Sequence, residues 1–284
     1  MPAAQSHTNY KLPQVTALFW VLKIAATTLG ETGGDLLAQT LHLGYAAASM
    51  LFLGIFAVSL AAQLRARRFH PALYWTVIAA TSTAGTTISD FLNRGPGSGT
   101  STDGGLGYGA GAAVLITGLA VVFAIWKLSG QTYDVTGITS TRGELLYWAA
   151  ILLSNTLGTS LGDYLSDSSG LGYGGGALLI AAVMAALLAA HYLTRISGVL
   201  LFWLAFILTR PLGATVGDLL SKSHEKGGLG FGTWGTTAVL LVVLIAGITY
   251  SYNGIRTLTG PQQDRVDVAA VDSKRIAGGL RREG

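Results

Sequence analysis

Long apolar stretches, separated by short polar segments, make up most of this chain. We place eight of them, at residues 15–38, 46–64, 73–92, 108–126, 145–165, 173–193, 199–220 and 231–250. A helix needs about 20 residues to cross a hydrocarbon core of about 30 Å, and each stretch approaches that length. Lipid offers the backbone no hydrogen-bonding partner, so helices are favoured there. The pattern predicts an all-α polytopic membrane helix bundle of about eight transmembrane helices.

The composition excludes several other classes of protein. Only 11% of the 284 residues are charged, whereas a soluble domain carries about 25%. The chain has no cysteine, which excludes a disulfide framework and a Cys-based metal site. It also lacks the Walker, EF-hand and HExxH motifs. We therefore expect a protein that is not an enzyme, needs no cofactor, and has the lipid bilayer rather than nucleic acid as its partner.

Basic residues gather on one side of the predicted membrane domain. On the side of the N-terminus, or in the tail, are Lys11, Arg65, Arg67, Arg68, Lys127, Arg142, Arg195, Arg256, Arg265, Lys274, Arg275, Arg281 and Arg282. The opposite side carries Arg94, Lys222 and Lys226. Cytoplasmic loops are rich in Lys and Arg, so we expect a multi-pass protein of the cell membrane with both termini cytoplasmic. Residues 1–12 are then a cytoplasmic segment, and residues 253–284 a polar, disordered tail.

Four tandem repeats organise the apolar stretches. The tryptophans at positions 20, 75, 148 and 203 each follow Phe or Tyr, and ten residues after each comes Gly. Fourteen residues after each Trp comes Gly or Ser, and fifteen after comes Asp. A short turn then leads to LGYA, LGYG or LGFG, which opens a second apolar helix. The membrane domain, residues 13–252, thus divides into two-helix repeats at about 13–66, 70–127, 143–194 and 197–252.

The repeats resemble those of a known family. Bacterial integral membrane proteins of this family are built from four tandem two-helix repeats of unknown function, each with a characteristic Trp. The resemblance covers nearly all of residues 13–252, and His42 departs from it where the other repeats have Gly before LGY. An even number of helices per repeat makes all repeats point the same way, unlike the inverted repeats of many transporters. This predicts a pseudo-fourfold ring or a pair of pairs, while the resemblance implies no activity.

Two sets of repeat positions have structural interpretations. Small residues four apart let helices approach closely in lipid, and we assign this role to Gly30, Gly34, Gly85, Gly158, Gly162, Gly213 and Gly217, with Ser89 in the second repeat. A Trp at the cytoplasmic start of a helix suits the membrane–water interface. We therefore expect interfacial positions for Trp20, Trp75, Trp148 and Trp203.

The repeat aspartates are the leading candidates for function. They are Asp35, Asp90, Asp163 and Asp218. Each lies about 22 Å along the helix from its Trp, in the outer half of the membrane or at its outer edge. Carboxylates inside a bilayer are costly and usually mark a pathway, so four of them around an axis would form a ring. Alternatively, each caps the following helix by accepting hydrogen bonds from LGYG amides.

Further polar side chains share a helix face with these aspartates. Hydroxyl and amide groups in three repeats form either a polar conduit or hydrogen bonds within the bundle. Lys23, Glu31 and Arg210 break the symmetry, and in a closed ring Glu31 and Arg210 could face each other. Five acids and two bases favour a cation or proton over an anion, although a structural ion-pair network is equally compatible.

These features predict a permease for a small cation, either a metal ion or a proton-coupled substrate. The four aspartates would form the outer site, with Glu31, Lys23 and Arg210 as gate or coupling charges. The alternative is a non-transporting structural or regulatory membrane protein whose aspartates cap and join helices. An intramembrane enzyme acting on lipid is more remote. Any metal, the substrate and the oligomeric state stay open at this level.

Overall fold

The computed structural model describes residues 12–66, 68–96, 104–138 and 140–252. Residues up to Leu244 form one compact unit, which contains the whole candidate site. A second unit begins at Ile245, and only the end of the last helix is described in it. The tail assigned to residues 253–284 and nearly all of the N-terminal segment assigned to residues 1–12 lie outside the described residues.

The described residues form eight long helices and no strand, which confirms the predicted all-α class. The helices are α1 (Ala17–Asp35), α2 (Tyr45–Arg65), α3 (Pro71–Arg94), α4 (Gly107–Leu128), α5 (Thr141–Asp163), α6 (Gly172–Leu193), α7 (Gly198–Ser221) and a last helix, Gly232–Tyr252. Two π-helical turns, η1 (Leu36–Thr40) and η3 (Tyr164–Ser168), extend α1 and α5. The 3₁₀ turns η2 (Val135–Gly137) and η4 (His224–Lys226) lie in connections.

Helix ends follow from local sequence. The hydroxyls of Thr16 and Ser140 accept hydrogen bonds from the amides of Phe19 (3.3 Å) and Gly143 (3.0 Å), which caps α1 and α5. The glycine after Leu in each LGYG-type segment has a φ between 64° and 78°. Only glycine adopts this left-handed conformation without strain, which explains why it recurs in all four repeats.

Five of these helices are long and apolar enough to cross a membrane: α2, α4, α6, α7 and Gly232–Tyr252. Helices α1, α3 and α5 span 19, 24 and 23 residues, but a polar face lowers their hydropathy. That face is buried inside the bundle at Thr27, Ser82 and Asn155, so lipid does not contact it. The chain is therefore a helical repeat protein compatible with multiple passes through a membrane.

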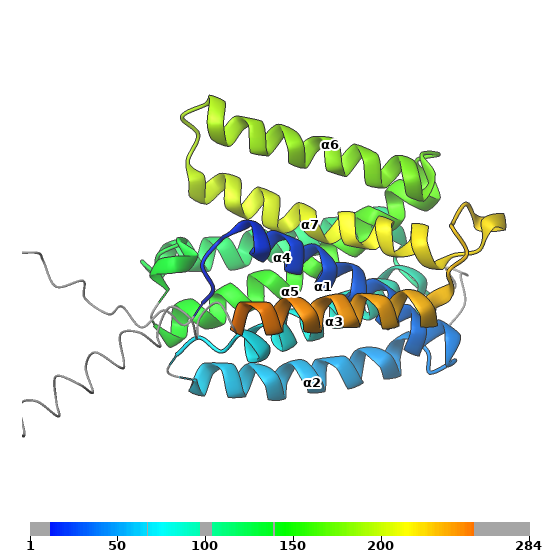
Figure 1. Ribbon diagram of the computed structural model, residues 1–284, viewed down its shortest axis with the longest axis horizontal. Helices are drawn as coiled ribbons and strands as arrows, with labels where there is room; N and C mark the ends of the chain where they lie inside the picture. The colour runs from blue at the N-terminus through cyan, green and yellow to red at the C-terminus, as the bar shows by residue number, and fades with distance from the viewer. Residues whose placement is uncertain (1–11, 67, 97–103, 139, 253–284) are drawn as a thin grey trace, which may run out of the picture. The chain divides into compact units, whose positions relative to one another are not determined.

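The first helices of the four repeats form a closed ring. Helix α1 packs on α3, α3 on α5, α5 on α7, and α7 back on α1. Of the other helices, α2 packs on α3, α4 on α5 and α6 on α7 (Figure 1). Each of these three helices therefore packs mainly on the first helix of the following repeat. The repeats are interlocked, so no single repeat contains its own core.

An aromatic belt encloses one end of the ring. Each repeat's aromatic residue before Trp contacts the Trp of the next repeat, with ring centroids 5.6–5.9 Å apart. The four pairs are Phe19–Trp75, Tyr74–Trp148, Tyr147–Trp203 and Phe202–Trp20. Trp75, Trp148 and Trp203 are buried, and only Trp20 is partly exposed. Aromatic partners from the neighbouring helix cover these three indoles, and the interfacial depth expected from sequence stays a prediction.

The repeated small residues lie where ring helices are closest. A Cβ at Gly85 would lie 2.9 Å from Asn155 Cβ, and one at Gly162 would lie 2.9 Å from Ala214 Cβ. Gly30, Gly158 and Gly213 meet Ser82, Arg210 and Thr27 in the same way, while Gly34 and Gly217 meet Thr86 and Glu31. Each small residue thus faces the next helix around the ring, and a larger side chain would force the two apart.

Candidate functional site

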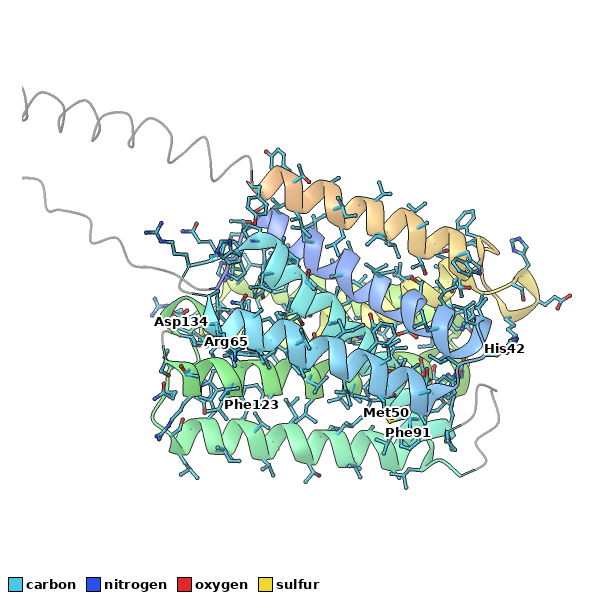
Figure 2. All side chains as sticks on the ribbon, turned by 90° about the horizontal axis from the view of Figure 1, so that it is seen from below. His42, Met50, Arg65, Phe91, Phe123 and Asp134 are labelled. Carbon is cyan, nitrogen blue, oxygen red and sulfur yellow. The ribbon has the colours of Figure 1, made fainter. Side chains whose placement is uncertain are left out.

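The inner face of the ring carries three layers of repeat positions. Proceeding away from the aromatic belt, the first holds Thr27, Ser82, Asn155 and Arg210, the second Glu31, Thr86, Thr159 and Ala214, and the third Asp35, Asp90, Asp163 and Asp218. All of these side chains are buried. Figure 2 separates the two ends of the bundle, with Arg65 and Asp134 at one and His42 and Phe91 at the other. Because Asp90 immediately precedes Phe91, the aspartate layer lies toward the His42 end.

Two basic side chains reach across the ring below the aspartates. Lys23 on α1 lies 3.5 Å from Asn155 Oδ1 on the opposite helix α5, and 4.1 Å from the ring centroid of Phe206. Asn155 in turn donates to Thr81 Oγ1 at 3.0 Å. Lys23 is fully buried, so its ammonium is held by an amide oxygen and an aromatic face.

Arg210 fills the next level of the ring. From α7 it donates to the carbonyl of Thr27 (3.2 Å) and to Glu31 Oε2 (3.0 Å) on the adjacent helix α1. It also donates to the carbonyl of Ser82 (3.3 Å) and to the hydroxyl of Thr86 on the opposite helix α3. Because α7 packs back on α1, Glu31 and Arg210 lie on adjacent helices and form an ion pair. A closed ring of the four repeats was expected to let them face each other. The guanidinium joins three helices at the centre of the ring.

The hydroxyl stripes beside these charges bond mainly to backbone. Thr28 donates to the carbonyl of Ile24 and Thr156 to that of Leu152, both at 2.9 Å. Thr83 donates to the carbonyl of Ala79 at 3.0 Å. Such bonds to the preceding turn are common for Ser and Thr in membrane helices. The hydroxyl stripes therefore line the inside of the ring, and the side chains of Lys23 and Arg210 extend across it to the opposite helices.

The aspartate layer divides into two pairs, each joined by one base. On one side Lys222 contacts Asp35 and lies 3.3 Å from Asp218 Oδ1. Gln39 donates to Asp35 and places its own Oε1 3.5 Å from the Lys222 ammonium. Glu31 belongs to the same group, because ligand oxygens of Glu31, Asp35 and Asp218 lie within 4.8 Å of one another. We call these five residues the Lys222 cluster.

On the other side, Arg94 joins Asp90 and Asp163. Its guanidinium lies 3.4 Å from Asp90 Oδ1, 3.2 Å from Asp163 Oδ2 and 3.3 Å from Asp167 Oδ2. Tyr108 accepts from Arg94 Nη2 at 2.8 Å and donates to Asp167 Oδ2 at 2.9 Å. We call these five residues the Arg94 cluster. Tyr45 lies at its edge and also accepts a hydrogen bond from Arg94, at 3.5 Å.

Sequence reasoning missed Arg94 and Lys222 as members of the site and counted both among the outer loops. Each stands four residues after a repeat Asp, where side chains on a helix are neighbours, so Asp90–Arg94 and Asp218–Lys222 were readable as pairs. The equivalent residues in the other two repeats are Gln39 and Asp167. Including both bases leaves five acids and four bases in the ring, so the excess of negative charge is one instead of three.

Lys222 remains an ammonium ion over the physiological pH range. It follows the last residue of α7. Burial by itself would lower the pKa of Lys222, but the negative charges of Asp218 and Asp35 outweigh this and raise it well above its usual value. The cluster therefore holds a permanent positive charge among its three carboxylates.

The LGYG-type segments bond to other groups than the repeat aspartates. The amides of Gly44, Leu106 and Gly230 donate to the carbonyls of Ala38, Leu92 and Lys222. The amide of Leu171 donates to the hydroxyl of Ser169. Among the described residues, the carboxylates thus pair with Lys222 and Arg94, and the helix-capping arrangement suggested as the alternative is not the one observed.

Comparison with known proteins identifies a family without an assigned activity. The family described as Repeat of Unknown Function (DUF347) matches residues 18–69, 73–132, 146–197 and 201–253. No curated protein and no solved structure matches the chain. The four matches begin next to the four repeat tryptophans and cover the ring and its outer helices. The chain therefore belongs to the DUF347 family, with four tandem copies of its repeat.

Proposed function

We propose that the protein is a permease for a small cation, and that the cation enters through the aspartate layer at the His42 end of the ring. The observation that carries this proposal is the column of ionisable side chains inside the ring. Lys23, Glu31, Asp35, Asp90, Asp163, Arg210 and Asp218 are all buried. Charged groups at membrane depth are costly, and they characteristically mark ion pathways and proton relays.

The sign of the charge supports a cation. The outer layer presents four carboxylates toward one end, and Glu31 adds a fifth beneath them. Lys222, one of the four bases, is on a flexible stem that lets an entering cation replace it at the carboxylates of Asp35 and Asp218. Lys23 and Arg210 lie deeper and reach across the ring. In this proposal they form the closed gate, and Glu31 couples the gate to the outer layer through its bond to Arg210.

Flux across proteoliposomes tests this function. The purified full-length protein is reconstituted, and influx is followed for H⁺, Na⁺, K⁺, Mg²⁺ and Mn²⁺, with protein-free liposomes as the baseline. We expect influx of at least one cation, reduced at least about tenfold by Asp35→Asn and by Glu31→Gln. Lys127→Gln, which alters an exposed charge, is the matched control and should behave like wild type. If no cation moves, or both acidic variants match wild type, the permease proposal is wrong.

The ion pairs themselves favour a second candidate function. Lys23 and Arg210 each bond to the opposite helix of the ring, as expected of charges that join helices in a non-transporting structural or regulatory membrane protein. On that alternative, Arg210→Gln lowers stability while no variant changes ion flux. The two functions thus differ in the flux measurement.

We further propose that the Arg65 end faces the cytoplasm of the cell membrane, with both termini on that side and no catalytic activity. The basic loop residues Arg65, Lys127, Arg142 and Arg195 support this orientation. A reporter fused after the last residue tests it: one that is active only in the cytoplasm should be active, and one that is active only outside should be silent.

A further inference from the structure

The Lys222 cluster differs from an ordinary ion pair in its number of acids. Three buried carboxylates, from Glu31, Asp35 and Asp218, converge within 4.8 Å of one another. One ammonium lies among them, in contact with Asp35 and 3.3 Å from Asp218. The Arg210 guanidinium holds Glu31 Oε2 from below, at 3.0 Å. The carboxylates thus form a nest of oxygen atoms around the position of the Lys222 head group.

A second observation is that Lys222 leaves one oxygen of this nest without a hydrogen bond, as Arg94 does at Asp90 Oδ1 in the other cluster. Asp218 Oδ1 is buried, and it accepts no hydrogen bond among the described residues although it is paired by charge with Lys222. Asp218 as a whole is 6% exposed, so water cannot freely supply the missing bond. A buried carboxylate oxygen without a donor is costly and becomes favourable when a cation binds it directly.

The ligand chemistry points to a divalent metal ion. Carboxylate and amide oxygens are the ligands that Mg²⁺, Mn²⁺ and Ca²⁺ prefer. Besides three carboxylates the cluster offers the amide oxygen of Gln39, which lies 3.5 Å from Lys222 Nζ. Since Arg210 pairs with Glu31, the carboxylates of Asp35 and Asp218 leave two negative charges, which the single charge of Lys222 does not balance and a divalent ion does. The Lys222 side chain is 16% exposed, and its four-carbon stem gives the ammonium freedom to move away.

We propose that Glu31, Asp35 and Asp218 form a binding site for a divalent metal ion, and that Lys222 is a tethered competitor which occupies the site when the metal is absent. The inference rests on the proposed permease function for its biological meaning, since it names the entry site and the class of substrate. Binding and transport are nevertheless separate measurements. The Arg94 cluster has no part in the site, because Thr159 stands at the repeat position of Glu31 there.

Direct Mn²⁺ binding to the purified full-length protein in detergent tests the proposal. Titration calorimetry and the loss of the free-Mn²⁺ electron paramagnetic resonance signal give the affinity. We expect wild type to bind Mn²⁺, and Lys222→Gln to bind at least about tenfold more tightly because the competing charge is gone. Lys222→Arg retains the charge and should bind no more tightly than wild type. Asp218→Asn should weaken binding at least about tenfold.

Asp167→Asn is the control, since it removes a carboxylate of the Arg94 cluster that lies outside the aspartate layer. It should bind Mn²⁺ with the affinity of wild type. The proposal is overturned if Lys222→Gln binds no more tightly than wild type, or if Asp167→Asn weakens binding as much as Asp218→Asn. If Lys222→Gln does not fold, the comparison of Asp218→Asn with Asp167→Asn decides alone, and the proposal is overturned if both weaken Mn²⁺ binding equally or neither does. Site-specific binding without flux would leave the metal site standing and reject the permease, whereas cation flux without Mn²⁺ binding would reject the site and leave the permease standing.

Discussion

The Lys222 and Arg94 clusters occupy equivalent places on opposite sides of the ring, yet they use their charges differently. Each has two repeat aspartates, one base four residues after an aspartate, and a third acid. In the Arg94 cluster the third acid is Asp167, whose side chain is 38% exposed. In the Lys222 cluster it is Glu31, buried within the ring. The third acid thus stands at a different repeat position in each cluster: Asp167 lies at the position of Gln39 and is partly exposed, whereas Glu31 lies at the position of Thr159 and is buried.

The choice of base follows the same division. Arg94 contacts three carboxylates and also donates to Tyr108, and a planar guanidinium suits such fixed, multiple bonds. Lys222 contacts two carboxylates and Gln39 through a compact ammonium on a flexible stem. The comparison indicates that Arg94 joins the helix ends in a fixed arrangement. Lys222, in contrast, is suited to leave its carboxylates when a metal ion binds them. Four experiments can break or sharpen this distinction.

Removing each base should separate the clusters most clearly. Arg94→Gln leaves Asp90 and Asp163 buried without a cation, and we expect it to reduce the free energy of unfolding by about 3–5 kcal/mol. Lys222→Gln should reduce it less, because Arg210 still neutralises Glu31 and Lys222 has fewer partners. Thermal unfolding of both variants in one detergent measures the difference. An equal or larger loss of stability in Lys222→Gln would contradict the stabilising role assigned to Arg94.

Exchanging the bases is a milder test of the same idea. Arg94→Lys keeps the positive charge but cannot bond to Asp163, Asp167 and Tyr108 at once, and should lose about 1.5–3 kcal/mol. Lys222→Arg should change the unfolding midpoint little. A variant Arg94→Lys as stable as wild type would show that charge alone, without the fork of the guanidinium, holds the Arg94 cluster.

Gly217 makes room for the inward acid of the Lys222 cluster. A Cβ at this position would lie 3.0 Å from Glu31 Cβ and 3.2 Å from its Cγ, so Gly217→Ala should cost about 1–3 kcal/mol of stability and weaken Mn²⁺ binding by displacing Glu31. Gly54→Ala in α2 is the control, since nothing lies within 4 Å of its added Cβ. Unchanged Mn²⁺ affinity in Gly217→Ala would argue against Glu31 as a ligand.

Ser89 stands at the same repeat position as Gly217, on the side of the ring that holds the Arg94 cluster. Its substitution should give the smallest effect. Its hydroxyl bonds to that of Ser160 at 2.8 Å, and Asn93 donates to both hydroxyls. Ser89→Ala should cost about 0.6 kcal/mol, the average for a hydrogen bond between membrane helices, and leave Mn²⁺ binding unchanged. Weakened Mn²⁺ binding in this variant would show that the two clusters are coupled.

Much of the fold was predictable because membrane helices can be recognised from their length and hydropathy. The helices begin and end within a few residues of the predicted stretches, and the repeat spacing correctly brought Glu31 and Arg210 onto adjacent helices. The burial of Trp75, Trp148 and Trp203 was not predicted. A Trp at a helix start is compatible with both lipid and protein contact, and only the neighbouring helix decides between them.

The sequence by itself determined the class, the repeat and the layers of the ring, because apolar length and helical periodicity are local properties. It also placed a carboxylate at the same level in all four repeats. Only the tertiary structure decided how those carboxylates are shared. Lys222 and Arg94 each lie one helical turn after a repeat aspartate, and closure of the ring brings each to the aspartate of the next repeat, which produces two clusters instead of one uniform ring of acids.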